Sequence, residues 1–275
     1  MSQALAVARY TLIELTRRRL LGVIVAIGVV LTAGIAVAPH VLRQPTPKDG
    51  VIVVLTALGA EVPYAITLCA FVVGMTVINH DLDSGAVVSI FAKSMSRSSY
   101  TAGKLMAAVS LLLLIAAIFT GGSLAVVAAN GGSVYGVVFW TLAALAANIV
   151  LLMLLLMLLT VYLNNVVAAA IVLVFHYVAG QVITLNAMVQ HNVITDAIAR
   201  TLIDIAYWGV PHELTSNLQR QILQLQIDTG ELRFGGQNPI DKLPDASGAV
   251  DIWFWFAYVV AISVLLFWSV RRKQV

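Results

Sequence analysis

Charged residues are scarce in this sequence. Only 11% of its 275 residues are Asp, Glu, Lys or Arg, whereas 60% are hydrophobic. A soluble protein of this length needs more charge on its surface and less apolar sequence for its core. The composition therefore excludes an ordinary soluble domain and predicts an all-α polytopic membrane protein.

The residues of several common sites are also missing. The single cysteine, Cys69, excludes an internal disulfide and a cysteine-rich metal site. The chain has no G-x-x-x-x-G-K-[ST] loop for ATP, and neither H-E-x-x-H nor G-x-S-x-G for hydrolysis. His80, Asp81 and Asp83 form a metal-like pattern, but acids beside a helix start are explained more simply by the helix dipole. We expect no metal, no cofactor and no catalytic residue in this chain.

Six long apolar runs are present. A transmembrane helix needs about 20 apolar residues, and six stretches come close to this length: 20–38, 62–79, 105–129, 136–163, 166–188 and 252–270. Pro63 is expected to start the second helix or to kink it. The pattern predicts six transmembrane helices.

The N-terminal residues 2–19 are amphipathic and end in three arginines. Their apolar residues recur at helical spacing, at Leu5, Ala8, Leu12 and Leu15. Two interpretations fit this pattern, a helix in the inner membrane interface and a basic segment in solution. We favour the interfacial helix. We also expect no signal cleavage after Ala38, because Pro39 follows it.

Basic residues set the orientation. With the N-terminus inside, ten of the sixteen basic residues but only three of the thirteen acidic residues face the cytosol. This asymmetry is typical of cytosolic loops and termini. The ten are Arg9, Arg17, Arg18, Arg19, Lys93, Arg97, Lys104, Arg271, Arg272 and Lys273. We expect both termini in the cytosol.

The longest polar stretch, 189–251, lies outside in this topology. Apolar residues recur at helical spacing over 196–207 and 212–227, and Pro211 suits the start of the second helix. Residues 229–250 are rich in glycine and proline and are expected to form an irregular loop. We expect two amphipathic helices that pack on the outer membrane face or on a second protomer.

A polar insert over 79–104 separates the second and third apolar runs. It begins with Asp81 and Asp83 and ends with three basic residues, Lys93, Arg97 and Lys104. Between them lies a cytosolic apolar patch made of Val87, Val88, Ile90 and Phe91. Such a patch usually marks a contact surface. The alternative is a helix that tucks under the bundle in the membrane interface.

The insert resembles that of the permease subunits of ABC transporters of the ABC-2 type, which are six-span exporters. That family has acidic residues and a glycine, then a Pro-x-Ser-Arg element, then Gly-Lys at the start of the third span. The matching residues here are Asp81, Asp83, Gly85, the Ser-Met-Ser-Arg of 94–97, and Gly103-Lys104. Ser94 stands where the family usually has proline. The basic N-terminal helix is similar to the family's elbow helix, and the Tyr-Trp-Gly-Val-Pro of 207–211 is similar to its aromatic-to-proline element.

The resemblance implies a partner that hydrolyses ATP. Residues 84–94 would form a cytosolic coupling helix docked on a separate ATP-binding subunit, which would hold ATP and Mg, so this chain would not itself be an enzyme. The contacts would come from Asp81, Asp83, Gly85, Val87, Val88, Phe91, Lys93 and Arg97. A second copy or a related permease would complete the transporter in a bacterial or archaeal cell membrane. Lipid would surround it, and no nucleic acid is implied. Substrate would be exported by alternating access along a path between the two permeases.

Three polar residues inside the spans are candidates for the substrate pathway: Asn148, His176 and Gln181. Asn148 and Gln181 are each about 16 residues from the turn at 164–165, so we expect them at equal depth and hydrogen-bonded to each other. His176 lies roughly 17 Å from that turn, near the bilayer middle. An ionisable group there is either functional or a neutral histidine bonded to a neighbouring helix.

Two other functional classes remain open at this point. The chain could be a membrane scaffold or sensor whose outer segment 189–251 binds a partner protein. It could also be an intramembrane enzyme, which is disfavoured because no catalytic constellation is present in the spans.

Overall fold

The computed structural model describes residues 3–17, parts of 22–34, and residues 63–78, 81, 95–129, 135–228 and 239–272. Every regular element in these ranges is a helix, which confirms the all-α fold for this part of the chain. The elements are α1 (Gln3–Thr16), a helix over Pro63–Thr76, α6 (Arg97–Ala129), α7 (Tyr135–Thr160), α8 (Asn165–Gln190), α9 (Ala197–Gly209), α10 (Leu218–Asp228), the 3₁₀ helix η1 (Pro239–Lys242) and α11 (Ala249–Arg272).

Four of the described helices are long and apolar enough to cross a membrane. They are Arg97–Phe119 within α6, Phe139–Thr160 within α7, α8, and α11. They coincide with the third to sixth predicted spans. The chain has no proline between Pro63 and Pro211, so nothing interrupts the backbone hydrogen bonds of α6, α7 and α8.

The other predicted elements are covered only in part. The second predicted span contains the helix Pro63–Thr76, which is apolar but shorter than a membrane crossing. The predicted N-terminal helix is present as α1. Most of the first predicted span, 20–38, and all of the predicted coupling helix, 84–94, lie outside the described residues.

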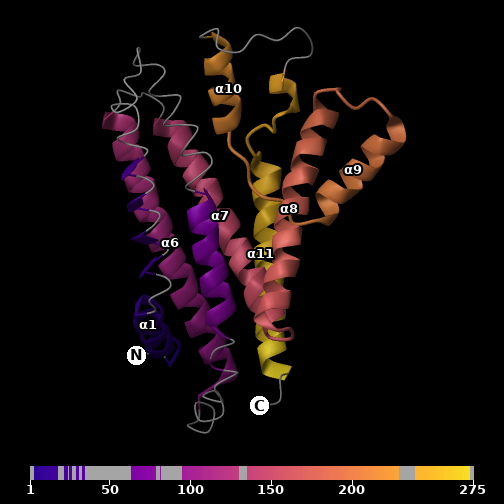
Figure 1. Cartoon of the computed structure of the whole chain (residues 1–275). Coiled ribbons are helices and arrows are strands. Elements are labelled where there is room, and N and C mark those ends of the chain that lie inside the picture. The colour runs from indigo at the N-terminus through magenta and orange to yellow at the C-terminus, as the bar shows by residue number, and fades with distance from the viewer. Residues whose placement is uncertain are drawn as a thin grey trace.

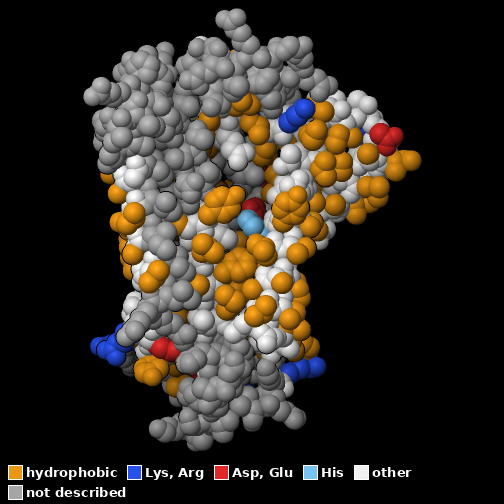
Figure 2. Space-filling view, in the orientation of Figure 1, with side chains coloured by type: hydrophobic (Ala, Val, Ile, Leu, Met, Phe, Trp, Pro, Cys, Tyr) orange, Lys and Arg blue, Asp and Glu red, His pale blue; other side chains and the backbone are white. Residues whose placement is uncertain are grey.

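The long helices form one bundle, and α1 and the C-terminal end of α11 lie at the same end of it (Figure 1). We call this end the basic end, because it carries Arg17, Arg97, Arg271 and Arg272. The opposite end carries α10. Lys and Arg side chains are visible at both lower corners of Figure 2, which correspond to the basic end.

The core lies between the helix Pro63–Thr76, α6, α7 and α11. These contribute completely buried side chains, among them Val73, Leu112, Met153 and Leu266. Gly74 lets the helix Pro63–Thr76 approach α7 closely, since a Cβ at this position would lie 3.0 Å from Leu156. Because these helices are apolar on nearly all sides, the face that each one buries is determined by how closely it packs against its neighbours.

Two of the four candidate spanning helices have little protein around them. Only 11% of the membrane window of α11 and 28% of that of α8 are buried, against 50% for α6 and α7. The large apolar side chains on their outer surfaces, such as Leu173, Val174, Val264 and Trp268, are exposed. These surfaces suit contact with lipid tails.

The segment after α8 differs from the sequence-based expectation in three respects: its second helix begins later, the 3₁₀ helix η1 lies in the stretch expected to be an irregular loop, and residues 210–217 contact the middle of the bundle instead of lying outside. Helix α9 agrees with the amphipathic stretch at 196–207, but the second outer helix begins at Leu218 instead of 212. Residues 210–217 are not helical, although the apolar spacing and Pro211 favoured a helix there. The reason is that their backbone groups have partners elsewhere: the N–H and C=O of Leu214 bond to Asn148, and the N–H of Thr215 bonds to Ser247.

Candidate functional site

A buried ion pair lies close to the basic end of the bundle. Lys104 on α6 places its Nζ 2.8 Å from Asp81 Oδ2 and 3.8 Å from Glu14 Oε2 on α1. Tyr100, one turn earlier on α6, donates its hydroxyl to the same Asp81 oxygen at 2.8 Å. The Lys104 and Asp81 residues are 3% and 7% exposed. Burial of this kind requires a paired charge, and the pairing connects α1, residue 81 and α6.

Glycine brings α1 and α6 into close contact beside this pair. A Cβ at Gly103 would lie 2.6 Å from the carbonyl oxygen of Ala4 and from Val7 Cβ. Any larger side chain would therefore push the two helices apart. The Gly103-Lys104 motif thus has two packing functions: the glycine sets the distance between the helices and the lysine supplies the charge between them.

Two of the eight predicted partner-contact residues are described. Asp81 is buried against Lys104 and Tyr100, and Arg97 donates from Nη1 to the carbonyl oxygen of Arg271 at 2.8 Å. These two residues therefore attach the two ends of the insert to the bundle. The other six (Asp83, Gly85, Val87, Val88, Phe91 and Lys93) lie outside the described residues.

The non-helical segment 210–217 connects α9 to α10 and contacts the middle of the bundle. The side-chain amide of Asn148 on α7 donates to the Leu214 carbonyl at 2.9 Å and accepts from the Leu214 N–H at 2.8 Å. Thr141 on α7 bonds to Ser216 at 2.8 Å. Irregular backbone at membrane depth is tolerated where protein groups satisfy its hydrogen bonds. The Asn148 side chain satisfies both backbone hydrogen-bonding groups of Leu214.

The predicted hydrogen bond between Asn148 and Gln181 is therefore wrong. Both polar atoms of the Asn148 side chain are bonded to the Leu214 backbone, and Gln181 is exposed on α8. Equal depth in the hairpin did not bring the two side chains together. The helix rotation turned Gln181 outward, while segment 210–217 supplied a nearer partner for Asn148.

His176, on α8, contacts a residue that the sequence analysis did not select. Its Nδ1 is hydrogen-bonded to Oε1 of Glu213 in segment 210–217. Neither side chain is fully buried, because 35% of His176 and 19% of Glu213 are exposed. Figure 2 shows a histidine beside an acidic side chain at mid-height, with hydrophobic side chains around them.

A cavity of about 350 Å³ opens at this pair. The helix Pro63–Thr76, α7, α8, segment 210–217 and α10 each contribute to its wall. Its polar lining includes two of the three predicted pathway residues, Asn148 and His176, together with Tyr64, Thr67, Glu213 and Gln219. Gln181 does not line it. A cavity that combines apolar walls with convergent polar groups is the usual form of a ligand site.

Polar contacts hold the segment after α10 in place. Asp245 pairs with Arg220 at 3.0 Å and with His191 at 3.2 Å, and Arg220 also donates to the Leu243 carbonyl at 2.8 Å. Thr215 Oγ1 donates to the Asp245 carbonyl at 2.6 Å. These bonds fix segment 210–217 from its other side, so the position of Glu213 is determined by contacts on two sides.

An aromatic cluster closes the α9 side of the bundle. His212 is stacked between the rings of Tyr207 and Phe254, with centroid distances of 4.0 and 5.3 Å. The Tyr207 hydroxyl donates to Asp251 at 2.8 Å. Burial, followed by the hydrogen bond to Asp251 and the charge of that carboxylate, raises the pKa of Tyr207 well above its usual value. Tyr207 therefore stays protonated and remains a donor.

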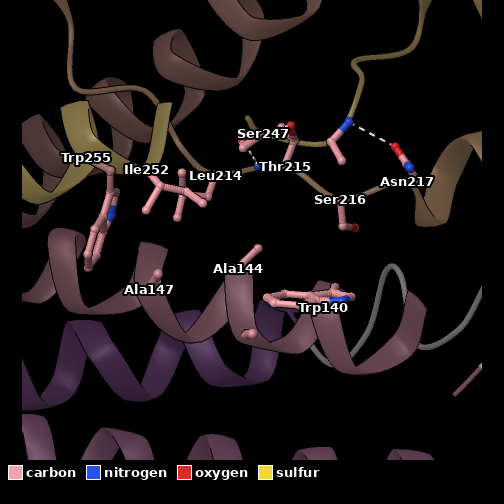
Figure 3. Close-up of a pocket in the computed structure, with 12 residues that line it drawn as sticks. Trp140, Ala144, Ala147, Leu214, Thr215, Ser216, Asn217, Ser247, Ile252 and Trp255 are labelled. Carbon is pink, nitrogen blue, oxygen red and sulfur yellow. Dashed lines mark hydrogen bonds between the residues drawn. The ribbon is translucent and has the colours of Figure 1, made fainter. Parts of the chain in front are cut away.

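A second, larger cavity lies between α7, segment 210–217 and α11 (Figure 3). Its volume is about 560 Å³, and its walls are mostly apolar. Trp140 from α7 and Trp255 from α11 lie at its two ends, and Ser216 points into it (Figure 3). The indole N–H of Trp255 is buried without a hydrogen-bond partner. No charged side chain is among the described residues that line this cavity.

The described residues contain no metal-binding group of three or more His, Cys, Asp or Glu. The chemistry that the geometry offers is ionic recognition at Glu213 and His176. Sequence reasoning missed Glu213 because it lies in a segment assigned to an outer helix, although an acid in an apolar, aromatic-rich stretch was a signal.

The sequence matches no model of a known protein family and no curated protein. The similarity to ABC-2 permeases therefore rests on the motif residues.

Proposed function

We propose that the chain is the permease subunit of an ABC transporter of the ABC-2 type. It would move substrate across or out of the membrane while a separate subunit binds and hydrolyses ATP. The observation that carries the proposal is the buried contact of Lys104 with Asp81 and Glu14. It connects α1 and α6 to residue 81, close to the start of the polar insert that the motif marks as the coupling region.

The contacts at the two ends of the insert give the proposal a mechanism. Residue 81 is bound to α1 and α6 through Lys104, and Arg97 is bound to the end of α11. A force on the insert would therefore reach α1, α6 and α11 together. Closely packed helices transmit such a displacement as rigid bodies instead of absorbing it.

The cavity at His176 and Glu213 supports a transport role. It lies at the middle of α7 and α8. A charged group at this depth costs free energy, and such groups usually have a function or a partner. Alternating access needs a polar site at about this depth, reached from either side as the helices move. In this proposal, Glu213 and His176 belong to the substrate pathway, and Asn148 positions the segment that carries Glu213.

Co-purification tests the partner. The tagged chain is isolated from its native membrane in mild detergent, and the eluate is assayed for ATP hydrolysis and for a bound ATP-binding cassette protein. Val88→Glu and Phe91→Glu place a charge in the apolar patch of the insert and should remove both. Leu202→Glu changes an exposed apolar residue of α9 and serves as the matched control.

Retention of the ATPase by Leu202→Glu and its loss from the two insert variants would support the proposal. The proposal fails if no ATPase co-purifies with the wild-type chain. It also fails if the ATPase binds the insert variants as well as it binds the wild type. The scaffold hypothesis would then be preferred, since it places the partner contact at 189–251.

A further inference from the structure

The 350 Å³ cavity is electrostatically asymmetric. Among the described residues that line it, Glu213 is the single carboxylate and His176 the single basic group, and there is no lysine or arginine. When His176 is neutral the lining carries one negative charge, and when it is protonated the lining is neutral. In neither state is the lining positive, so an anion would find only a carboxylate beside it.

The remaining walls suit an apolar ligand body. Leu145, Ile149 and Leu152 of α7 form one side. Tyr64, from the helix Pro63–Thr76, adds an aromatic ring, and 71% of its surface is exposed. An aromatic ring close to a carboxylate is a common recognition pattern for organic cations, because the face of the ring also attracts positive charge. The cavity volume is at the lower end of the range of small-molecule sites.

We propose that this cavity binds a lipophilic organic cation, and that Glu213 is its counter-ion. The His176 proton competes with the ligand, because protonated His176 and the ligand cation would use the same carboxylate. Binding therefore releases the His176 proton to water and leaves the imidazole neutral. This proposal rests on the permease function proposed above and names the substrate class of that permease.

Neighbouring titratable groups do not supply an alternative partner for Glu213. His212 is the next residue in the chain, but its Nδ1 is bonded to the Tyr207 carbonyl and its ring is stacked away from the cavity. On α10, Arg220 is paired with Asp245. The span Phe139–Thr160 of α7 has no titratable residue. On α9, Arg200 bonds to Ile194 and Asn192, and Asp204 is exposed.

Binding can be measured on the isolated chain in lipid nanodiscs. The probe is the tetraphenylphosphonium cation, and tetraphenylborate is the matched anion of nearly the same size and shape. The affinity for the cation should increase as the pH rises and His176 loses its proton. Since one proton competes with one ligand, the increase is at most about tenfold per pH unit.

Two substitutions separate the two functions of the site. Glu213→Gln keeps the shape of the side chain and should weaken cation binding by about tenfold or more. His176→Gln should keep binding and remove its pH dependence. Asp204→Asn removes a carboxylate from the exposed surface of α9 and should change neither property. Circular dichroism of each variant checks that the helices remain folded.

The proposal is overturned by any of three results. Equal binding of tetraphenylborate would show that charge is not recognised, and unchanged binding to Glu213→Gln would show that the carboxylate is not the counter-ion. A decrease in affinity with rising pH would exclude competition with the His176 proton. Because the ATP-binding subunit is absent from this assay, such a result would leave the co-purification test of the permease function intact.

Discussion

Lys104 and Asp81 form an ion pair inside the protein, with Nζ 2.8 Å from Oδ2 and side chains that are 4% and 11% exposed. Removal of one charge from such a buried pair usually costs about 3–5 kcal/mol. Lys104→Met should therefore lower the free energy of unfolding by about this amount. Denaturant unfolding in detergent, followed by helical circular dichroism, measures the change.

The double variant Lys104→Met/Asp81→Leu is the control for this prediction. Because both charges are replaced by apolar groups, it should be more stable than Lys104→Met alone. The Tyr100 hydroxyl still loses its Asp81 acceptor, so full recovery is not expected. If the two substitutions simply add, the charges are not coupled in the way that the geometry indicates.

Two glycines of α6 give a matched comparison. Gly103→Ala would place a Cβ 2.6 Å from Ala4 O and should separate α1 from α6, which destabilises the protein. At Gly121 nothing lies within 4 Å of the added Cβ, so Gly121→Ala should gain up to about 1 kcal/mol from helix propensity. Opposite shifts of the thermal midpoint are expected. Equal shifts would contradict the close contact at Gly103.

The long helices were predictable from sequence because their signal is local. Apolar runs without proline over 97–190 determine α6, α7 and α8 wherever the rest of the chain lies. Segment 210–217 was not predictable in this way. Its apolar spacing fits a helix, but Asn148, 66 residues away from Leu214, supplies the hydrogen bonds that a helix would otherwise provide. The contact of His176 with Glu213 could not be predicted for the same reason, because the two residues are 37 positions apart in the sequence.

Asn148 should matter for stability, whereas Gln181 should not. Asn148→Leu leaves the N–H and C=O of Leu214 without their partner, at a cost of about 1–3 kcal/mol. Gln181→Leu replaces an exposed side chain with an apolar one and should be nearly neutral. Unfolding in detergent compares the two variants. A large loss in Gln181→Leu, or none in Asn148→Leu, would contradict this assignment.

The raised pKa of Tyr207 predicts that the free energy of unfolding decreases at alkaline pH. Its pKa is raised in the folded protein, mainly by burial and by Asp251. The unfolded value is about 10, so the stabilising contribution is complete below about pH 10 and decreases as the pH rises above it. Wild type should lose stability there faster than Tyr207→Phe. A titration of tyrosinate absorbance should give the same curve for both proteins up to the point where Tyr207 ionises.

The two ends of the bundle should face opposite sides of the membrane. Asp204 on α9 and Ser98 on α6 are both exposed, and the only native thiol, Cys69, is buried. Asp204→Cys should therefore react with a membrane-impermeant maleimide on intact cells, whereas Ser98→Cys should react only after lysis. The expectation follows from the basic residues at the Ser98 end, which are retained on the cytosolic side. Labelling in the reverse order would place the insert outside, where no ATP-binding subunit could reach it.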